Sequence, residues 1–112
     1  MTNAALLAWS IVFMVARILT GEIGVVPEAA IPVAQVAYER IKVGWGYEGW
    51  YAIADEPADW ALDAAWKAWR MGGSGNLYAI SGADLEALEF DKRNWENVGS
   101  TRWPLYVGEV WR

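Results

Sequence analysis

The chain has no cysteine and no histidine among its 112 residues. Without cysteine it can form no disulfide and offers no thiol nucleophile. The lack of histidine excludes Ser-His and Cys-His catalysis and most zinc sites. Any chemistry must therefore rest on carboxylates, hydroxyls and tyrosine, and we expect neither a metal nor a cofactor.

Basic residues are also few. Nine Lys and Arg stand against 14 Asp and Glu, which gives a net charge of -5, and the basic residues form no cluster. A phosphate backbone is recognised by concentrated positive charge. We therefore expect no nucleic-acid partner.

Tryptophan, in contrast, is abundant, with nine residues in a chain long enough for a single domain, residues 1–112. This is more tryptophan than one small core requires. Some of these side chains should lie at a binding surface, where flat aromatic faces suit sugar rings or other aromatics, although core packing is the commoner fate of each one taken singly.

The longest apolar run covers residues 4–16, in which Ser10 is the one polar residue, and it ends at Arg17. It is shorter than the roughly 18 to 20 apolar residues of a membrane span, and it lacks the basic start and cleavage site of a signal peptide. We predict a core helix over residues 3–20, with residues 4–19 central and most buried and with Gly21 as its left-handed cap.

Glu22 directly follows this helix in the prediction. The negative end of the helix dipole and the apolar surroundings both disfavour the ionised carboxylate, so we expect a raised pKa. A raised pKa suits a general acid that works near neutral pH. The alternative is an ordinary surface glutamate in a turn between two helices.

Two further helices are predicted, over residues 27–42 and 55–71. Pro27 fits the first turn of the second helix, and Asp55 or Glu56 can cap the third. The apolar stripes expected to face the core are Val33, Val36, Ala37 and Ile41 in the second helix and Leu62, Ala65, Trp66 and Trp69 in the third.

Residues 43–51 place three glycines among four aromatic residues, which fits neither a helix nor a strand. We interpret the segment as a shaped aromatic loop. Its sugar-stacking candidates are Trp45, Tyr47, Trp50 and Tyr51. The alternative is a loop whose aromatic side chains fold back to close the core.

The last third of the chain predicts a small β element. Residues 76–81 predict a short strand after a glycine-rich turn. Ser81 and Asp84 are the expected capping pair of a short helical turn. Residues 103–111 predict one or two closing strands. The fold class is therefore α+β, mainly helical, with a central apolar helix, at least two more helices and a small β element.

The order of these features resembles the SleB-like cell-wall hydrolases, the family of the spore-cortex-lytic enzymes. The resemblance runs from about Ile11 to the C-terminus and rests on short motifs in a fixed order. The matching segments are Gly21-Glu22, Pro27-Glu28 through Glu39-Arg40, Trp45, Gly72 through Leu77-Tyr78, and Val107 through Trp111.

The resemblance implies a lysozyme-like domain that cleaves the glycan strand of peptidoglycan between N-acetylmuramic acid and N-acetylglucosamine. Glu22 matches the family's catalytic acid, and a lytic transglycosylase mechanism needs no second carboxylate. Tyr78 and Ser81 lie on the strand expected to flank the cleft and are candidates for positioning the sugar, or ordinary strand residues. The expected setting is a phage endolysin or virion-associated lysin, cytoplasmic until release and without a membrane span.

The chain also departs from the family. Val25-Val26 stands where the family has a second Glu, Glu39 replaces an Asn, and the His of the terminal strand is missing. These departures favour an alternative, a catalytically degenerate module of the same fold that binds glycan or has a structural role. A third possibility is a helical domain that uses its tryptophan-rich face on a protein partner.

Overall fold

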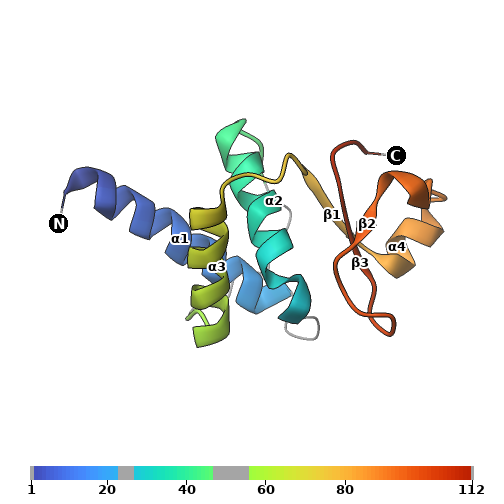
Figure 1. Ribbon diagram of the computed structural model, residues 1–112, viewed down its shortest axis with the longest axis horizontal. Helices are drawn as coiled ribbons and strands as arrows, with labels where there is room; N and C mark the ends of the chain where they lie inside the picture. The colour runs from blue at the N-terminus through green and yellow to red at the C-terminus, as the bar shows by residue number, and fades with distance from the viewer. Residues whose placement is uncertain (1, 23–26, 47–55, 112) are drawn as a thin grey trace.

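The computed structural model describes residues 2–22, 27–46 and 56–111, apart from the side chain of Glu22 (Figure 1). The helices are α1 (Asn3–Glu22), α2 (Ala30–Lys42), α3 (Asp59–Met71) and α4 (Gly82–Ala87), with 3-10 turns η1 (Pro27–Ala29) and η3 (Lys92–Asn94). The strands are β1 (Tyr78–Ser81), β2 (Glu96–Asn97) and β3 (Leu105–Gly108). The mainly helical α+β class is confirmed.

The three strands form an antiparallel sheet in the order β1-β3-β2. β1 pairs with β3 so that Tyr78 lies opposite Gly108 and Ser81 opposite Leu105. In Figure 1 this sheet and α4 lie beside a bundle formed by α1, α2 and α3. Both the strand expected at residues 76–81 and a closing strand within residues 103–111 are confirmed.

The main core lies where the three long helices meet. Its largest side chains are apolar residues of α1 and α2 with no exposed surface, or almost none: Val12, Val15, Ile18, Leu19, Val33 and Val36. The expected stripe of α2 is confirmed for Val33, Val36 and Ala37, while Ile41 is partly buried.

The buried face of α3 differs from the prediction. Four alanines face the core, Ala61, Ala64, Ala65 and Ala68, whereas Trp69 is 40% exposed and Leu62 and Trp66 are only partly buried. Of the expected stripe, Ala65 is buried, Leu62 and Trp66 pack against the edge of the core, and Trp69 is the member that the prediction misplaced. Because α3 contacts both α1 and α2, small side chains at the crossing let the three backbones approach closely.

A second, smaller core fills the space between the sheet and α4. It consists of Ile80, Leu85 and Trp95, with Tyr78, Phe90 and Tyr106 packed against them. Successive side chains of a strand point to opposite faces, so β1 contributes Ile80 to this core and Ala79 to the main core. The sheet therefore connects the two cores.

The two halves of α1 have different environments, which corrects the prediction for residues 4–19. Val12, Val15, Ala16, Ile18 and Leu19 are fully buried, but Leu6 and Leu7 are 48% and 64% exposed. In Figure 1 the N-terminal half of the helix projects away from the bundle. Only the second half is central, because only there is the helix packed into the core with α2 and α3.

By length and hydropathy alone, α1 is a candidate membrane span over Asn3–Gly21, with a mean hydropathy of 1.9. A share of 28% of this stretch is buried inside the domain. The core helix of a soluble protein passes the same test.

The predicted ends of the helices also need two corrections. α1 continues through Gly21 to Glu22, so Gly21 is not a left-handed cap; a helical glycine costs only about 1 kcal/mol and does not force a stop. α3 begins at Asp59 rather than near residue 55. Its N-cap residue Ala58 has no capping side chain of its own, and its N–H donates to Thr20 Oγ1 at 3.0 Å.

Candidate functional site

The end of α2 places Trp45. Gly44 adopts a left-handed conformation with φ of 76° just after the C-cap residue Val43. The N–H of Gly44 donates to the Ile41 carbonyl, and the N–H of Trp45 donates to the Arg40 carbonyl at 2.8 Å. This pair of bonds is the Schellman motif, for which glycine is the preferred residue. A local helix stop therefore fixes the backbone from which the indole projects.

Arg40, on the last turn of α2, connects this turn to the sheet. Its Nε donates to the Leu77 carbonyl at 2.6 Å, and one terminal nitrogen donates to the Gly46 carbonyl at 2.7 Å. The planar guanidinium can serve two acceptors in fixed directions, which a lysine ammonium does not reproduce. The segment leading into β1 and the segment after Trp45 are thus held to one side chain.

The same guanidinium lies against two aromatic rings. Its central carbon is 5.9 Å from the centre of the Trp45 ring and 5.1 Å from the centre of the Tyr78 ring. The two ring centres are 6.1 Å apart. Two of the side chains selected from the sequence, which are far apart along the chain, therefore lie together around Arg40.

Further rings extend this group across the sheet. Tyr78 contacts Trp111 with ring centres 5.3 Å apart, and Trp111 contacts Phe90 and Trp95. Trp95 is buried, while Trp45 and Trp111 are 43% and 47% exposed. We call the outer three rings, Trp45, Tyr78 and Trp111, the aromatic cluster. Two of its members are therefore accessible to solvent.

Gly108 allows Trp95 to support the cluster from beneath. A Cβ atom at position 108 would lie 2.8 Å from the Trp95 ring, closer than real contacts permit. Since Gly108 pairs with Tyr78 across the sheet, the absence of a side chain on β3 leaves room for the indole below. This close approach explains a glycine in the middle of the terminal aromatic segment.

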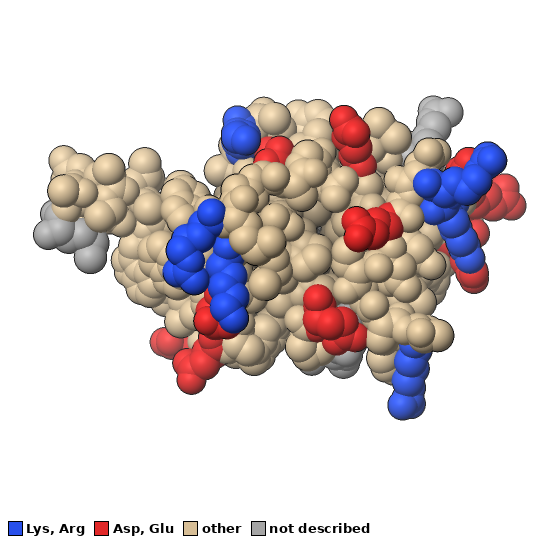
Figure 2. Space-filling model, viewed as in Figure 1, with Lys and Arg blue, Asp and Glu red and all other residues tan. Residues whose placement is uncertain are grey.

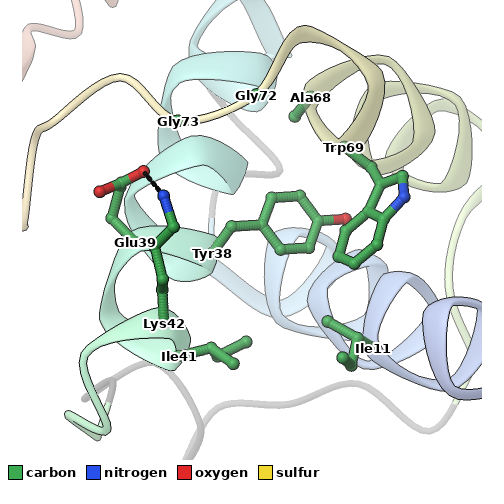
Figure 3. A pocket seen from close by; sticks show the side chains of 9 residues that line it. All are labelled: Ile11, Tyr38, Glu39, Ile41, Lys42, Ala68, Trp69, Gly72 and Gly73. Carbon is green, nitrogen blue, oxygen red and sulfur yellow. Dashed lines mark ion pairs between the residues drawn. The ribbon is translucent and has the colours of Figure 1, made fainter.

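A cavity of about 320 Å³ opens between α1, α2 and α3 (Figure 3). Its lining is mostly apolar and comprises Ile11, Tyr38, Glu39, Ile41, Lys42, Ala68, Trp69, Gly72 and Gly73. In Figure 3 the rings of Tyr38 and Trp69 lie at one side, and the Glu39 carboxylate and the Lys42 ammonium lie at the other. The two charged atoms are 3.7 Å apart.

Tyr38 has a structural role at this cavity. Its hydroxyl donates to the Ala65 carbonyl at 2.9 Å, which connects α2 to α3, and its ring meets Trp69 edge to face. Burial raises the pKa of the Tyr38 phenol well above its ordinary value, because the phenolate would lose water contacts. The hydroxyl therefore stays protonated at neutral pH and acts as a hydrogen-bond donor.

Glu39 is the mostly buried carboxylate at the cavity edge, with 13% of its side chain exposed. A Cβ atom at Gly73, in the segment that follows α3, would overlap its carboxylate, so a larger residue there would require the Glu39 side chain to move. The cavity thus combines an apolar interior, two aromatic rings and one acceptor group. Such a site suits a group with an apolar body and a hydrogen-bond donor.

The remaining predicted residues are placed only in part. Glu22 is the last residue of α1, as expected for an acid at a helix end, but its side chain lies outside the described part of the structure. Tyr47, Trp50 and Tyr51 lie outside the described residues as well. Their expected roles stay predictions.

Ser81 is not part of the aromatic cluster. Its Oγ accepts the N–H of Asp84 at 3.2 Å and caps α4, which confirms the predicted capping pair. Tyr78 and Ser81 are three residues apart on one strand, so their side chains point to opposite faces of the sheet. The two candidates for sugar positioning therefore do not act on one bound ring.

The end of α1 and the aromatic cluster lie toward opposite ends of α2. Glu22 is separated from η1, which leads into α2, by residues 23–26, whereas Trp45 follows the other end of that helix (Figure 1). The 13 residues of α2 span about 20 Å at 1.5 Å per residue. One small ligand cannot contact both places, but an extended polymer can.

No protein-family model, curated protein sequence or solved structure matches this chain. The geometry of the site and the resemblance in the sequence are therefore the grounds on which a function is proposed. Arg40 and Trp111 were not among the residues selected from the sequence. The glycine two residues after Lys42 was the one local signal that could have placed Trp45 at a helix stop.

Proposed function

We propose that the protein binds the glycan strand of peptidoglycan along the aromatic cluster and cleaves it with Glu22 as the proton donor. The observation that carries the proposal is the meeting of Trp45 and Tyr78 around Arg40, with the side chains of Trp45 and Trp111 nearly half exposed to solvent. Flat apolar faces bordered by hydrogen-bonding groups suit the alternating apolar and hydroxylated surfaces of sugars.

The separation of the cluster from the end of α1 fits a polymeric substrate. About 20 Å of helix lies between them, so several successive sugar rings would bridge the distance. Rings held at the cluster would contribute binding energy at a distance from the reacting bond. Such remote binding helps to position the bond against its acid.

The reaction proceeds with one carboxyl group. Glu22 donates its proton to the glycosidic oxygen as the bond from that oxygen to C1 of N-acetylmuramic acid breaks. The C6 hydroxyl of the same sugar then bonds to C1, and its proton returns to the Glu22 carboxylate. The products are a 1,6-anhydro sugar end and a free hydroxyl on the leaving sugar, and no water is consumed.

A glycan-binding module without turnover is the second candidate. The absence of the family's second Glu, where Val25-Val26 stands, favours it. This alternative keeps the aromatic cluster and removes the role of Glu22. Binding and cleavage must therefore be measured separately.

Glu22→Gln tests cleavage. The amide keeps the shape of the side chain but has no proton to donate, so release of muropeptides from purified peptidoglycan should fall by roughly two to four powers of ten. The thermal unfolding midpoint should stay level or rise slightly, since a charge is removed from the negative end of a helix dipole. Release equal to wild type would reject Glu22 as the acid, and no release by wild type across several wall types would favour the binding module.

Trp45→Ala and Trp111→Ala test binding. Each should weaken co-sedimentation with insoluble peptidoglycan by about five- to thirty-fold, the effect of losing 1–2 kcal/mol of contact. Trp103→Ala is the matched control, because Trp103 is 52% exposed and lies outside the cluster. Equal weakening by all three variants would mean that the cluster is not the binding surface.

Charge gives the binding assay a further readout. The chain carries a net charge of -5 and bacterial walls are anionic, so attraction must come from ring contacts and hydrogen bonds. Added salt screens the repulsion between the two. Binding to peptidoglycan should therefore hold or strengthen as the salt concentration rises.

A further inference from the structure

The first half of α1 extends from the domain as an N-terminal arm, defined here as residues 2–10. In Figure 1 it projects beyond α3, and in Figure 2 its surface lacks both basic and acidic side chains. Leu7 is 64% exposed, Leu6 48% and Trp9 37%. About half of Leu6 and more of Leu7 is open to solvent, whereas Trp9 packs on Trp66 where the arm joins the domain.

Between Ala4 and Leu7 the arm is apolar around its whole circumference. Residues 4–7 are all exposed and all apolar, and four consecutive helical residues point in directions about 100° apart. A helix that is apolar on every side is typical of a protein core or of a lipid environment. A protein partner would instead cover one face and would meet polar residues at the rim of that face.

Two polar side chains of the arm are already bonded to its own backbone. Thr2 Oγ1 accepts the N–H of Ala5 at 3.1 Å, and Ser10 Oγ donates to the Leu6 carbonyl at 2.9 Å. Polar groups with internal partners cost less in an apolar layer than groups without them. The other N–H groups of the first helical turn still need acceptors, which lipid headgroups provide.

Aromatic rings gather where the arm joins the domain. Trp9 stacks on Trp66 with ring centres 6.0 Å apart and contacts Phe13 at 5.4 Å. Tryptophan is enriched at the boundary between headgroups and hydrocarbon, because one end of the ring is apolar and the other carries an N–H. The arm and its base thus have the chemistry of an interfacial segment.

We propose that the N-terminal arm inserts into the boundary between the headgroups and the hydrocarbon of a lipid bilayer. It does not span the bilayer, because its nine residues measure about 14 Å against a hydrocarbon core of about 30 Å, and the rest of α1 belongs to the domain core. The proposal does not depend on glycan cleavage. The arm has no charge and the chain is acidic, so neutral lipid suffices.

The test is flotation of the full chain with vesicles of neutral phosphatidylcholine. Wild type should float with the vesicles, and Leu6→Lys/Leu7→Lys should lower the partition coefficient at least about ten-fold, since two lysines replace two inserted leucines. The matched control is Leu88→Lys/Val110→Lys, which adds the same charge at two positions that are 52% and 55% exposed away from the arm. It should bind within about two-fold of wild type, and 0.5 M salt should leave binding unchanged.

A second measurement reports on the arm without added charge. The chain has no cysteine, so Leu7→Cys and Leu88→Cys each accept one polarity-sensitive fluorophore. Vesicles should shift the emission of the probe at position 7 to the blue and leave that at position 88 unchanged. The proposal is wrong if wild type does not float, if both lysine pairs weaken binding equally, or if the arm instead supports a dimer that Leu6→Lys/Leu7→Lys dissociates in sedimentation velocity.

Discussion

Arg40 has a structural role that its position in the sequence does not indicate. It donates to carbonyls on two segments and lies against the rings of Trp45 and Tyr78. These partners are up to 38 residues away along the chain. Sequence spacing predicts neighbours on one helix but not contacts between a helix and a later strand, so this role could not be predicted.

Arg40→Lys should lower both stability and glycan binding. Lysine keeps the charge but loses the two fixed hydrogen bonds and the planar contact with the rings. We expect the free energy of unfolding to fall by about 1–3 kcal/mol, measured by urea denaturation, and binding to peptidoglycan to weaken. Lys42→Ala is the control, since the Lys42 side chain is 70% exposed. Equal urea midpoints for the two variants would contradict the role of Arg40.

Glu22 shows how far a local pattern can locate a functional residue. An apolar run followed by a glycine and an acid correctly placed Glu22 at the end of a helix, although the glycine proved to be helical. The position was predictable because apolar periodicity marks helix length. The direction of its side chain depends on neighbours from the rest of the fold, which periodicity does not specify.

At the scale of the elements, Thr20 connects the end of α1 to the start of α3. Its hydroxyl donates to the Ala16 carbonyl at 2.8 Å and accepts the N–H of Ala58 at 3.0 Å. It therefore supplies the cap that α3 lacks in its own sequence. The cap was expected at Asp55 or Glu56, but α3 starts at Asp59 with Ala58 as its N-cap residue, and Asp55 itself lies outside the described residues.

Thr20→Val removes this bond and keeps the shape of the side chain. We expect a loss of about 1 kcal/mol in the free energy of unfolding, within the range of 0.5–2 kcal/mol for helix caps. Ser10→Ala is the control, because Ser10 also donates to the carbonyl four residues earlier but accepts no hydrogen bond from another element in the described chain. Its loss should stay below about 0.5 kcal/mol. Equal losses in chemical denaturation would exclude a cap by Thr20.

The fully buried face of α3 differs from the predicted stripe for an identifiable reason. Its large residues and its alanines both recur at helical spacing, since Ala61, Ala64, Ala65 and Ala68 follow the same three- and four-residue steps as the expected stripe. Periodicity therefore allowed two faces, and hydrophobicity favoured the larger side chains. Packing between two helices selected the alanine face, because close approach needs small residues.

At the scale of the whole molecule, the sheet lies between two cores of different composition. Val107 on β3 belongs to the helical core, whereas Ile80 on β1 belongs to the core under α4. The element types and their order were predictable, because each has its own local signal. The division into two cores was not, because it depends on which face of each strand meets which helix.

The molecule measures 47 × 26 × 24 Å along its principal axes, and Figure 1 shows that the N-terminal arm contributes to the longest dimension. The sequence predicted one buried helix here, since the apolar run of residues 4–16 extends across both halves of α1. Hydropathy measures the preference of a side chain for an apolar environment and not whether the fold supplies one. The exposed half is therefore the part of the fold that the sequence could not reveal.

The same substitution at two leucines of α1 tests this division. Leu19 is fully buried in the helical core, so Leu19→Ala should lower the free energy of unfolding by about 2–5 kcal/mol. Leu7 lies on the N-terminal arm, so Leu7→Ala removes no packed contact and should change it by less than about 0.5 kcal/mol. Alanine is a strong helix former, so both variants keep the helix, and the difference reports burial alone.

A small domain has only about 5–15 kcal/mol of stability, so urea midpoints measured in the absence of lipid should separate the two clearly. A large loss at Leu7 in that experiment would mean that the arm packs against the protein in solution.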